Sequence, residues 1–372
     1  MAQGKVITNN LNLAQGATPE IERKALFVGT GEFGGDNLGQ FIPVNSQSDI
    51  DDAVGSGSPV AIQVLAAQQN GGENWQAVAA PCDPEDLNLI GTAAQALETH
   101  SAELICVCDP VTTKQEVEAW QAFAETQRTS KARRVIVLLA TARIDSFTET
   151  WSDYLTAQEA LQDGVAAYRV ALVPLLHRTD LGVVSGRLCN GSVSIADSPM
   201  RVATGPVTGL ADIPTDSAGV ALSDATLAAL DGFRLSCVQH YTDYPGTYWG
   251  DCNLLDAPGG DYQVIEHLRV VDKAARRIRI RQINRIANRQ LNSTASSIEN
   301  NRTYFMAPLR EMSRGQVFAG QQFPGDIHPP ADDHVQIDWP TNTKCVVYFK
   351  VRPYHSPKTI EANILLDLSQ PQ

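Results

Sequence analysis

The chain has 372 residues, of which 43% are hydrophobic and 19% are charged. This length and composition exclude small scaffolds stapled by disulfides or metals, and they exclude disordered proteins. The 29 basic and 42 acidic side chains give a net charge of −13, which excludes nucleic-acid or anionic-lipid binding over the surface as a whole. Seven scattered cysteines, short apolar runs and the polar start of the sequence predict a soluble chain made in the cytoplasm.

Residues 1–20 are predicted to form an N-terminal arm. A short β-like run at Val6 and Ile7 is followed by polar, turn-prone sequence that contains Leu11 and Leu13. These few apolar residues cannot build a core of their own. We therefore expect an arm and not a domain.

Residues 21–210 alternate short apolar runs with longer segments of mixed polarity. The runs predict strands at 25–28, 60–65, 104–108, 135–139 and 170–175, and the segments between them predict helices at 86–100, 114–128 and 157–163. Strands of about five apolar residues separated by helices are typical of an α/β domain with a largely parallel sheet. The fold class predicted for this part is α/β.

Residues 211–355 are predicted to form a second, α+β domain. Prolines and glycines between 198 and 216 indicate a boundary near 205–215. After the boundary we predict a short helix at 223–230, a strand at 233–241, a long helix from about 261 to 291 and a strand at 344–352.

The short motifs predict no cofactor, metal or catalytic site. The sequence Gly29-x-Gly31-x-x-Gly34 follows a predicted strand, but no helical pattern follows it, as a dinucleotide site would require. Cys106 and Cys108 fit a buried strand, and the His328 region fits a solvated turn. A flexible loop at the sheet is the favoured interpretation of the glycines, and nucleotide binding is the alternative.

Residues 356–372 are predicted to form a C-terminal arm with one strand. Apolar residues alternate with mostly polar ones over 359–368, and the apolar positions are Ile360, Ala362, Ile364, Leu366 and Leu368. Fully extended, residues 356–372 could reach about 55 Å. The strand could complete a sheet in another subunit, or it could be the last strand of its own domain.

A basic segment lies at residues 262–302, where nine basic side chains face three acidic ones. Four arginines recur every four residues and would form one stripe on a helix: Arg277, Arg281, Arg285 and Arg289. Like charges at this spacing repel each other, so the stripe predicts acidic partners, either within the chain or on another protein. Nucleic acid is a rival partner, but the interleaved aromatic residues that usually accompany it are missing.

Taken in order, several stretches resemble the contractile tail sheath proteins of myovirus-type bacteriophages. They are the arm at 5–16 leading into the sequence IERKALFVG at 21–29, the sequence GTYWGDCN at 246–253, the sequence YQVIEHLRVVD at 262–272 opening a basic helix, and the terminal strand. The common sheath ending Trp-Gly-x-Arg-Thr is replaced here by Trp249-Gly250-Asp251-Cys252-Asn253. This departure indicates a divergent, compact branch.

The resemblance implies a two-domain sheath subunit with an outer α/β domain at 21–210 and an inner domain facing a tail tube. Both arms would add as β-strands to sheets of neighbouring subunits through their apolar residues, and the four arginines would face the tube. The expected partners are further copies of the chain, the tail tube protein, and baseplate and tail terminator proteins, with no nucleic acid and no direct membrane contact.

The expected place of the chain is the virion tail, after assembly in the host bacterial cytoplasm. The expected function is a structural one, in which the sheath contracts and drives the tube through the host envelope without enzymatic turnover. The alternatives are an α/β enzyme or nucleotide-binding protein that uses the loop at 29–34, and a sheath of a phage-derived bacteriocin or other injection device.

Overall fold

The computed structural model describes residues 20–318 and 320–364. Six strands form one sheet in the order β2-β3-β1-β4-β5-β6, where β2 is antiparallel to β3 and all other neighbours are parallel. The predicted α/β class with a largely parallel sheet is confirmed. The strands are β1 (Ala25–Thr30), β2 (Ile42–Asn45), β3 (Gln76–Cys82), β4 (Leu104–Val111), β5 (Ile136–Thr141) and β6 (Val170–Pro174).

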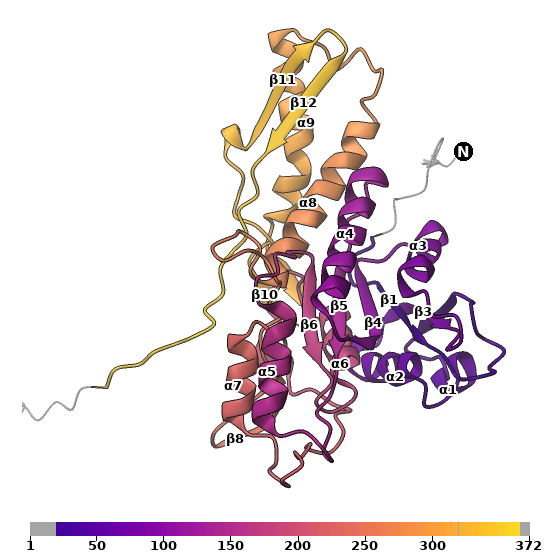
Figure 1. Ribbon diagram of the computed structural model, residues 1–372. Coiled ribbons are helices and arrows are strands. Elements are labelled where there is room, and N and C mark those ends of the chain that lie inside the picture. Colours follow the sequence, from indigo (N-terminus) through magenta and orange to yellow (C-terminus); the bar gives the residue numbers. More distant parts are fainter. Residues whose placement is uncertain (1–19, 319, 365–372) are drawn as a thin grey trace, which may run out of the picture.

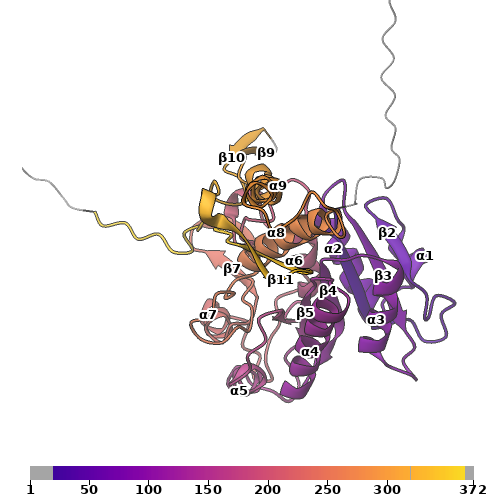
Figure 2. The ribbon, with the colours of Figure 1, turned by 90° about the horizontal axis from the view of Figure 1, so that it is seen from above.

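Helices cover both faces of this sheet. Figure 2 shows α2 and α6 on one face and α3 and α4 on the other. Because both faces are covered, strands such as β5 and β6 are buried along their whole length, which explains their unbroken apolar sequences. The helices of this part are α1 (Ile50–Val54), α2 (Pro59–Gly71), α3 (Leu89–Thr99), α4 (Lys114–Ser130), α5 (Trp151–Gln162) and α6 (Asp180–Cys189).

The strand predicted at 60–65 is wrong, because these residues lie in α2. Ser58 caps the helix and Pro59 occupies its first turn. Apart from Gln63, which is buried, the run is apolar because α2 packs on both the sheet and the neighbouring helix α6, so it shows no polar face that would reveal a helix. Glycines allow this close packing: a Cβ atom on Gly182 would lie 2.1 Å from the carbonyl oxygen of Gln63. No element was predicted for β2, β3 or α6.

The second half of the chain adds helices and hairpins. The helix predicted at 223–230 is confirmed as α7 (Asp224–Gly232), and the strand predicted at 233–241 shortens to β7 (Val238–Tyr241). The strand predicted at 344–352 is confirmed as β12 (Lys344–Phe349). The other elements are β8 (Tyr244–Trp249), α8 (Ile265–Ile283), α9 (Ala295–Met312), β9 (Gln316–Phe318), β10 (Gln321–Phe323), β11 (Val335–Thr341) and two short 3-10 turns at Val202–Thr204 and Asp332–His334.

The long helix predicted at about 261–291 is confirmed only over 265–283, as α8. Helix α8 ends at Ile283, the chain turns, and α9 follows on its own after a cap at Thr294. The turn is held from α9, because the Ser297 hydroxyl and the Asn301 amide both donate to the carbonyl oxygen of Gln290, at 2.9 and 2.7 Å. Because these contacts are polar, the spacing of apolar residues does not reveal the break between α8 and α9.

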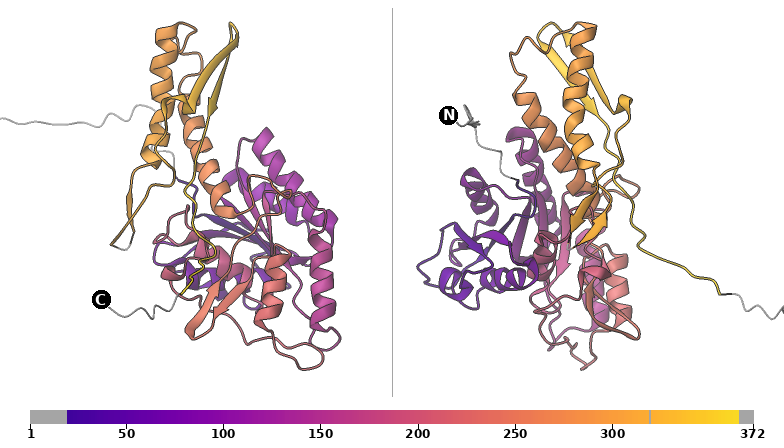
Figure 3. Two further views of the ribbon diagram at one scale, coloured as in Figure 1. Left: turned by 90° about the vertical axis from the view of Figure 1, so that its left-hand side faces the viewer. Right: turned by 180° about the vertical axis from the view of Figure 1, so that it is seen from behind.

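Two apolar clusters stabilise the molecule. The first runs from Ala25 to Leu268 and includes both faces of the large sheet. The second begins at Val270, on the same helix α8, and contains mainly side chains of α8 and α9 together with Ile327 and Val335. The packing therefore changes within α8, later in the chain than the domain boundary predicted at 205–215. Figures 1 and 3 show α8, α9 and the β11–β12 hairpin standing out from the sheet body.

Candidate assembly interface

The glycine-containing loop after β1 does not form a phosphate cradle. The Asp109 carboxylate, at the end of β4, accepts hydrogen bonds from the backbone N–H and the hydroxyl of Thr30, both at 2.6 Å. No helix opens in this loop, and the next one, α1, begins at Ile50. A phosphate at the end of β1 would meet a carboxylate where a nucleotide site offers free N–H groups.

The cysteines and histidines singled out in the sequence have structural surroundings. Cys106 and Cys108 are buried in β4, and burial raises the pKa of the Cys106 thiol to about 12. The His328 ring packs on Tyr354, with 3.8 Å between the ring centroids. Among residues 20–318 and 320–364, no group of three or more His, Cys, Asp or Glu side chains is arranged to hold a metal ion. No helix in the same ranges is long and apolar enough to cross a membrane.

Buried ion pairs fasten α8 to the sheet body. Arg269 makes two hydrogen bonds to the Glu103 carboxylate, at 2.6 and 2.8 Å, and both side chains are almost fully buried. Asp272 accepts from Arg169, at 2.8 and 3.1 Å, and from Arg134, at 2.8 Å. Glu103, Arg134 and Arg169 lie just before the first residues of β4, β5 and β6, so these contacts join α8 to the starts of three neighbouring strands.

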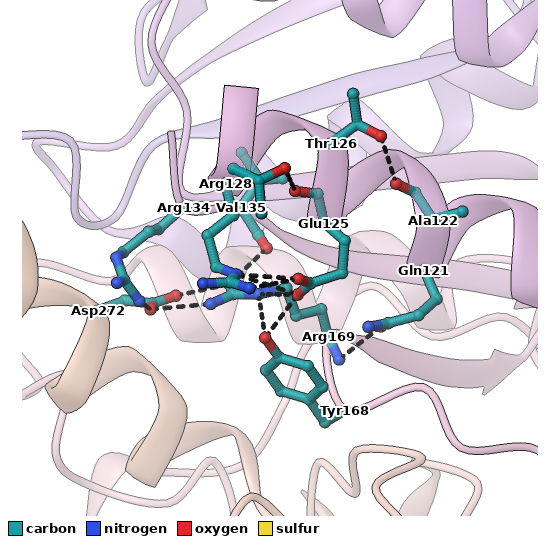
Figure 4. Close-up of polar contacts among 11 residues, drawn as sticks. Gln121, Ala122, Glu125, Thr126, Arg128, Arg134, Val135, Tyr168, Arg169 and Asp272 are labelled. Carbon is teal, nitrogen blue, oxygen red and sulfur yellow. Dashed lines mark hydrogen bonds and ion pairs between the residues drawn. The ribbon is translucent and has the colours of Figure 1, made fainter. Parts of the chain in front are cut away.

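Figure 4 shows Arg169 between two sets of oxygen atoms. On one side is Asp272 of α8, and on the other are Glu125 of α4 and the Tyr168 hydroxyl. Burial by itself lowers the pKa of an arginine, but Asp272 overcomes this effect, so the pKa of Arg169 is raised above its ordinary value. The guanidinium therefore stays charged and links the start of β6 to helices α4 and α8.

The four arginines of the predicted stripe do not share one helix face, because α8 ends before Arg285. Arg277 pairs with Glu20 at 2.8 Å. Arg281 lies over the Tyr304 ring and within 3.7 Å of Glu311. The acidic partners predicted for this stripe are thus partly supplied by the chain itself.

The other two arginines of the set lie in the turn between α8 and α9. The Arg285 guanidinium is 4.1 Å from the centre of the Tyr304 ring. Arg289 is exposed, and no ion pair to it is found in the described part of the chain. Both side chains line a groove of about 810 Å³ that opens between this turn and the β11–β12 hairpin.

The N-terminal arm enters the described structure at α8. Glu20 pairs with Arg277, and Glu22 pairs with Arg276 at 2.7 Å. The arm residues proposed to contact neighbours, Val6, Ile7, Leu11 and Leu13, lie outside the described residues.

The C-terminal arm leaves the structure at the opposite end of α8. The Lys358 ammonium contacts Asp251 at 2.9 Å and Glu266, in the first turn of α8, at 2.5 Å. Beyond it Ile360 and Ile364 are 83% and 94% exposed, and Ala362 is exposed as well. Residues 359–364 form no strand, and Leu366 and Leu368 lie outside the described residues. Figure 1 shows this segment extending away from the body.

The β11–β12 hairpin is an incomplete sheet. Its strands pair with each other, and among the described residues no third strand pairs with either outer edge. Val335 and Ile337 of β11 pair with Phe349 and Val347 of β12, and α9 packs beside β11. The sequence analysis missed β11, although Val335, Ile337 and Trp339 alternate with polar residues, because nearby prolines favoured a loop. Unpaired strand edges are the usual place where an extended segment of another chain binds.

Comparisons with known proteins identify the family of the chain. Two family models match: "DUF2586, N-terminal domain" over residues 3–253 and "DUF2586, C-terminal domain" over residues 261–369. A protein of Haemophilus phage HP1, strain HP1c1, named "Putative tail sheath protein", is 41% identical over 368 residues, which is 97% of each chain.

Solved structures with the same fold are sheath and baseplate structures. The helical sheath of the anti-feeding prophage in its contracted state has a TM-score of 0.63 at 14% identity and covers 98% of this chain and 99% of that one. A chain of the six-fold anti-feeding prophage baseplate has a TM-score of 0.61 at 12% identity, covering 98% and 100%. The sheath tail protein from Listeria innocua has a TM-score of 0.56 at 8% identity, covering 91% and 93%. The resemblance to tail sheath proteins seen in the sequence is confirmed, and the chain belongs to the DUF2586 family, together with the tail sheath relative from the Haemophilus phage.

Proposed function

We propose that this chain is the structural subunit of a contractile phage tail sheath that polymerises around a tail tube. The observation that carries the proposal is an incomplete two-stranded sheet, β11–β12, on a subunit whose two arms leave from fixed points on α8. An arm of one copy would add a strand to this sheet in another copy. Contraction of the resulting mesh would then drive the tube through the host envelope.

The energetics of strand addition suit a mesh that must move without coming apart. An added strand forms several main-chain hydrogen bonds, each worth about 0.5–1.5 kcal/mol net, and buries one apolar face. The alternating residues Ile360, Ala362 and Ile364 would supply part of that face, and the half-buried side chains of β12 would receive it. Each contact is modest, but every subunit repeats it.

The further partners in this proposal are the tail tube, the baseplate and the tail terminator, and the expected place is the virion tail after assembly in the host cytoplasm. Neither nucleic acid nor a membrane is a proposed partner. A phage relative at 41% identity favours a phage tail over another injection device. The alternative of an enzyme or nucleotide-binding protein depended on the loop at 29–34. It has little support, because the Asp109 carboxylate accepts the N–H and hydroxyl hydrogen bonds of Thr30 at the start of this loop.

Deletion of residues 359–372 tests the proposal. We expect a folded monomer with an unchanged melting temperature that forms no tubes or polysheaths in electron micrographs, because the described body makes no strand from this segment. Deletion of residues 369–372 alone is the matched control, since it leaves the alternating residues in place and should still polymerise. If the longer deletion aggregates or loses its cooperative melt, the strand belongs to its own domain.

A further inference from the structure

Both arms are attached to one helix. The C-terminal segment is held at Glu266, in the first turn of α8, and the N-terminal segment is held at Arg276 and Arg277. Ten residues of helix separate Glu266 from Arg276, which corresponds to about 15 Å along the axis. A single rigid element thus fixes the distance between the points where the two arms leave the body.

The N-terminal attachment is a cluster of charged hydrogen bonds. Arg276 contacts both carboxylate oxygens of Glu22, at 2.7 and 3.0 Å, and the Glu22 side chain is only 6% exposed. One residue further, the backbone N–H of Arg23 donates to Glu103 at 2.7 Å, and Glu103 is also the partner of Arg269. Such charge-assisted contacts away from water are stronger and more directional than surface ion pairs.

The C-terminal attachment depends on one cation. Lys358 is the ion-pair partner of two buried carboxylates, Asp251 and Glu266. Asp251 also accepts from the Ser198 hydroxyl and the Cys252 N–H, whereas Glu266 Oε2 is buried without a hydrogen-bond partner. Burial raises the pKa of Glu266 and would lower that of Lys358, but the two carboxylates overcome this effect and raise the pKa of Lys358. The chain is therefore fixed at Lys358 and exposed over residues 359–364.

We propose that Glu22, Arg276 and Lys358 are positioning residues that hold the roots of both arms on α8 at a set distance, so that the arms leave the body ready to bind neighbours. The inference rests on the proposed function of the arms. A segment whose root is fixed loses less conformational freedom on binding than one whose root is free, so the anchored arm binds more readily with no new contact to its neighbour. The side chains act through the arms and need not touch the next subunit.

A charge swap tests the N-terminal root. Glu22→Arg and Arg276→Glu each place like charges together, and we expect each to slow tube formation about tenfold, which corresponds to about 1.4 kcal/mol. The rates are measured by light scattering and electron microscopy at a temperature where circular dichroism shows every variant folded. The double variant Glu22→Arg/Arg276→Glu restores the pair in reverse and should recover most of the rate. A double variant no faster than the slower single one overturns the anchor at this root.

The C-terminal root is tested with Lys358→Met against the matched control Lys114→Met, because Lys114 makes an exposed ion pair with Asp163 away from both arms and from the β11–β12 hairpin. We expect Lys358→Met to lower both the melting temperature and the assembly rate, and the control to change neither. Adding Asp251→Asn removes one of the two uncompensated carboxylates and should recover melting temperature without recovering assembly. If assembly returns together with stability, Lys358 is structural and does not position the arm.

Failure of the anchoring proposal can be told apart from failure of the proposed function. If deletion of residues 359–372 leaves polymerisation intact, the role of the arm in trans is wrong. If the deletion abolishes polymerisation while the variants at Glu22, Arg276 and Lys358 assemble at the wild-type rate, the arm acts in trans but its anchoring on α8 is wrong.

Discussion

The large sheet and the β11–β12 hairpin differ in how their strands are completed. In the large sheet both faces are covered by helices, and strands such as β1 and β4 are paired on both sides. The hairpin has two strands, has α9 beside it, and borders a groove of about 810 Å³. The large sheet ends at β2 and β6, and the chain around Leu235 and Leu255 lies along β6. In the hairpin, by contrast, neither strand has a second partner strand among the described residues, so both offer an edge beside apolar surface.

This difference explains how a sheath subunit can be stable as a monomer and still have strand edges that are free to pair with a neighbouring subunit. The apolar cluster from Ala25 to Leu268 supports the monomer by burial, which depends little on neighbours. The cluster that begins at Val270 is much smaller, so the region around it gains more from a neighbour's strand. Charged pairs of α8 join the two regions.

The largest effect is expected from a cavity in the large sheet. Phe27, in β1, is fully buried, and Phe27→Ala should lower the free energy of unfolding by about 3–5 kcal/mol. Phe305 is equally buried but lines the groove beside the hairpin, where neighbouring side chains can relax, so Phe305→Ala should cost no more than the lower end of that range. Denaturant unfolding of both variants measures the difference. Equal costs would show that the two clusters are packed alike.

A somewhat smaller effect is expected where the two regions meet. Arg169→Met removes the main partner of the buried Asp272 and should cost about 3 kcal/mol, the low end for a broken buried pair, because Arg134 remains. Arg128→Met is the matched control, since Arg128 pairs with Glu125 near the surface and should cost no more than about 1 kcal/mol. Thermal melts of the two variants test this order. Similar small losses in both would mean that the network in Figure 4 contributes little to stability.

How each element is packed also explains which helices and strands could be predicted from the sequence. Strands β1, β4, β5 and β6 were found because a strand buried on both faces is a short apolar run. The same rule failed for α2, whose residues at 60–65 are apolar except for the buried Gln63, because the helix packs on both the sheet and α6. Helix α9 was missed because its contacts to the preceding turn are polar, and apolar spacing does not detect them.

The composition of the arms and the basic segment was visible in the sequence, but their placement was not. Arg277 and Glu20 are 257 positions apart, and Lys358 and Glu266 are 92 positions apart, so nothing local indicates that they pair. Regular spacing suggested one stripe of four arginines. The end of α8 at Ile283 divides it, and Arg277 and Arg281 already contact acidic side chains of the same chain.

The smallest effect on stability is expected at Arg285 and Arg289, which we still propose as contacts to an acidic surface of the tail tube. Reversing both to Glu removes the half-buried cation–π contact of Arg285 with Tyr304 and its hydrogen bond to Gln290, and should change the free energy of unfolding by no more than about 1 kcal/mol. Assembly around tubes should weaken, and in the wild type it should weaken with salt, because salt screens the attraction between these two arginines and an acidic surface. Self-association of sheath without tubes should persist.

The control is Arg310→Glu, a charge reversal at an exposed position on α9, which should leave both assemblies intact. Equal loss of both assemblies in the double reversal would place these arginines at a contact between sheath subunits.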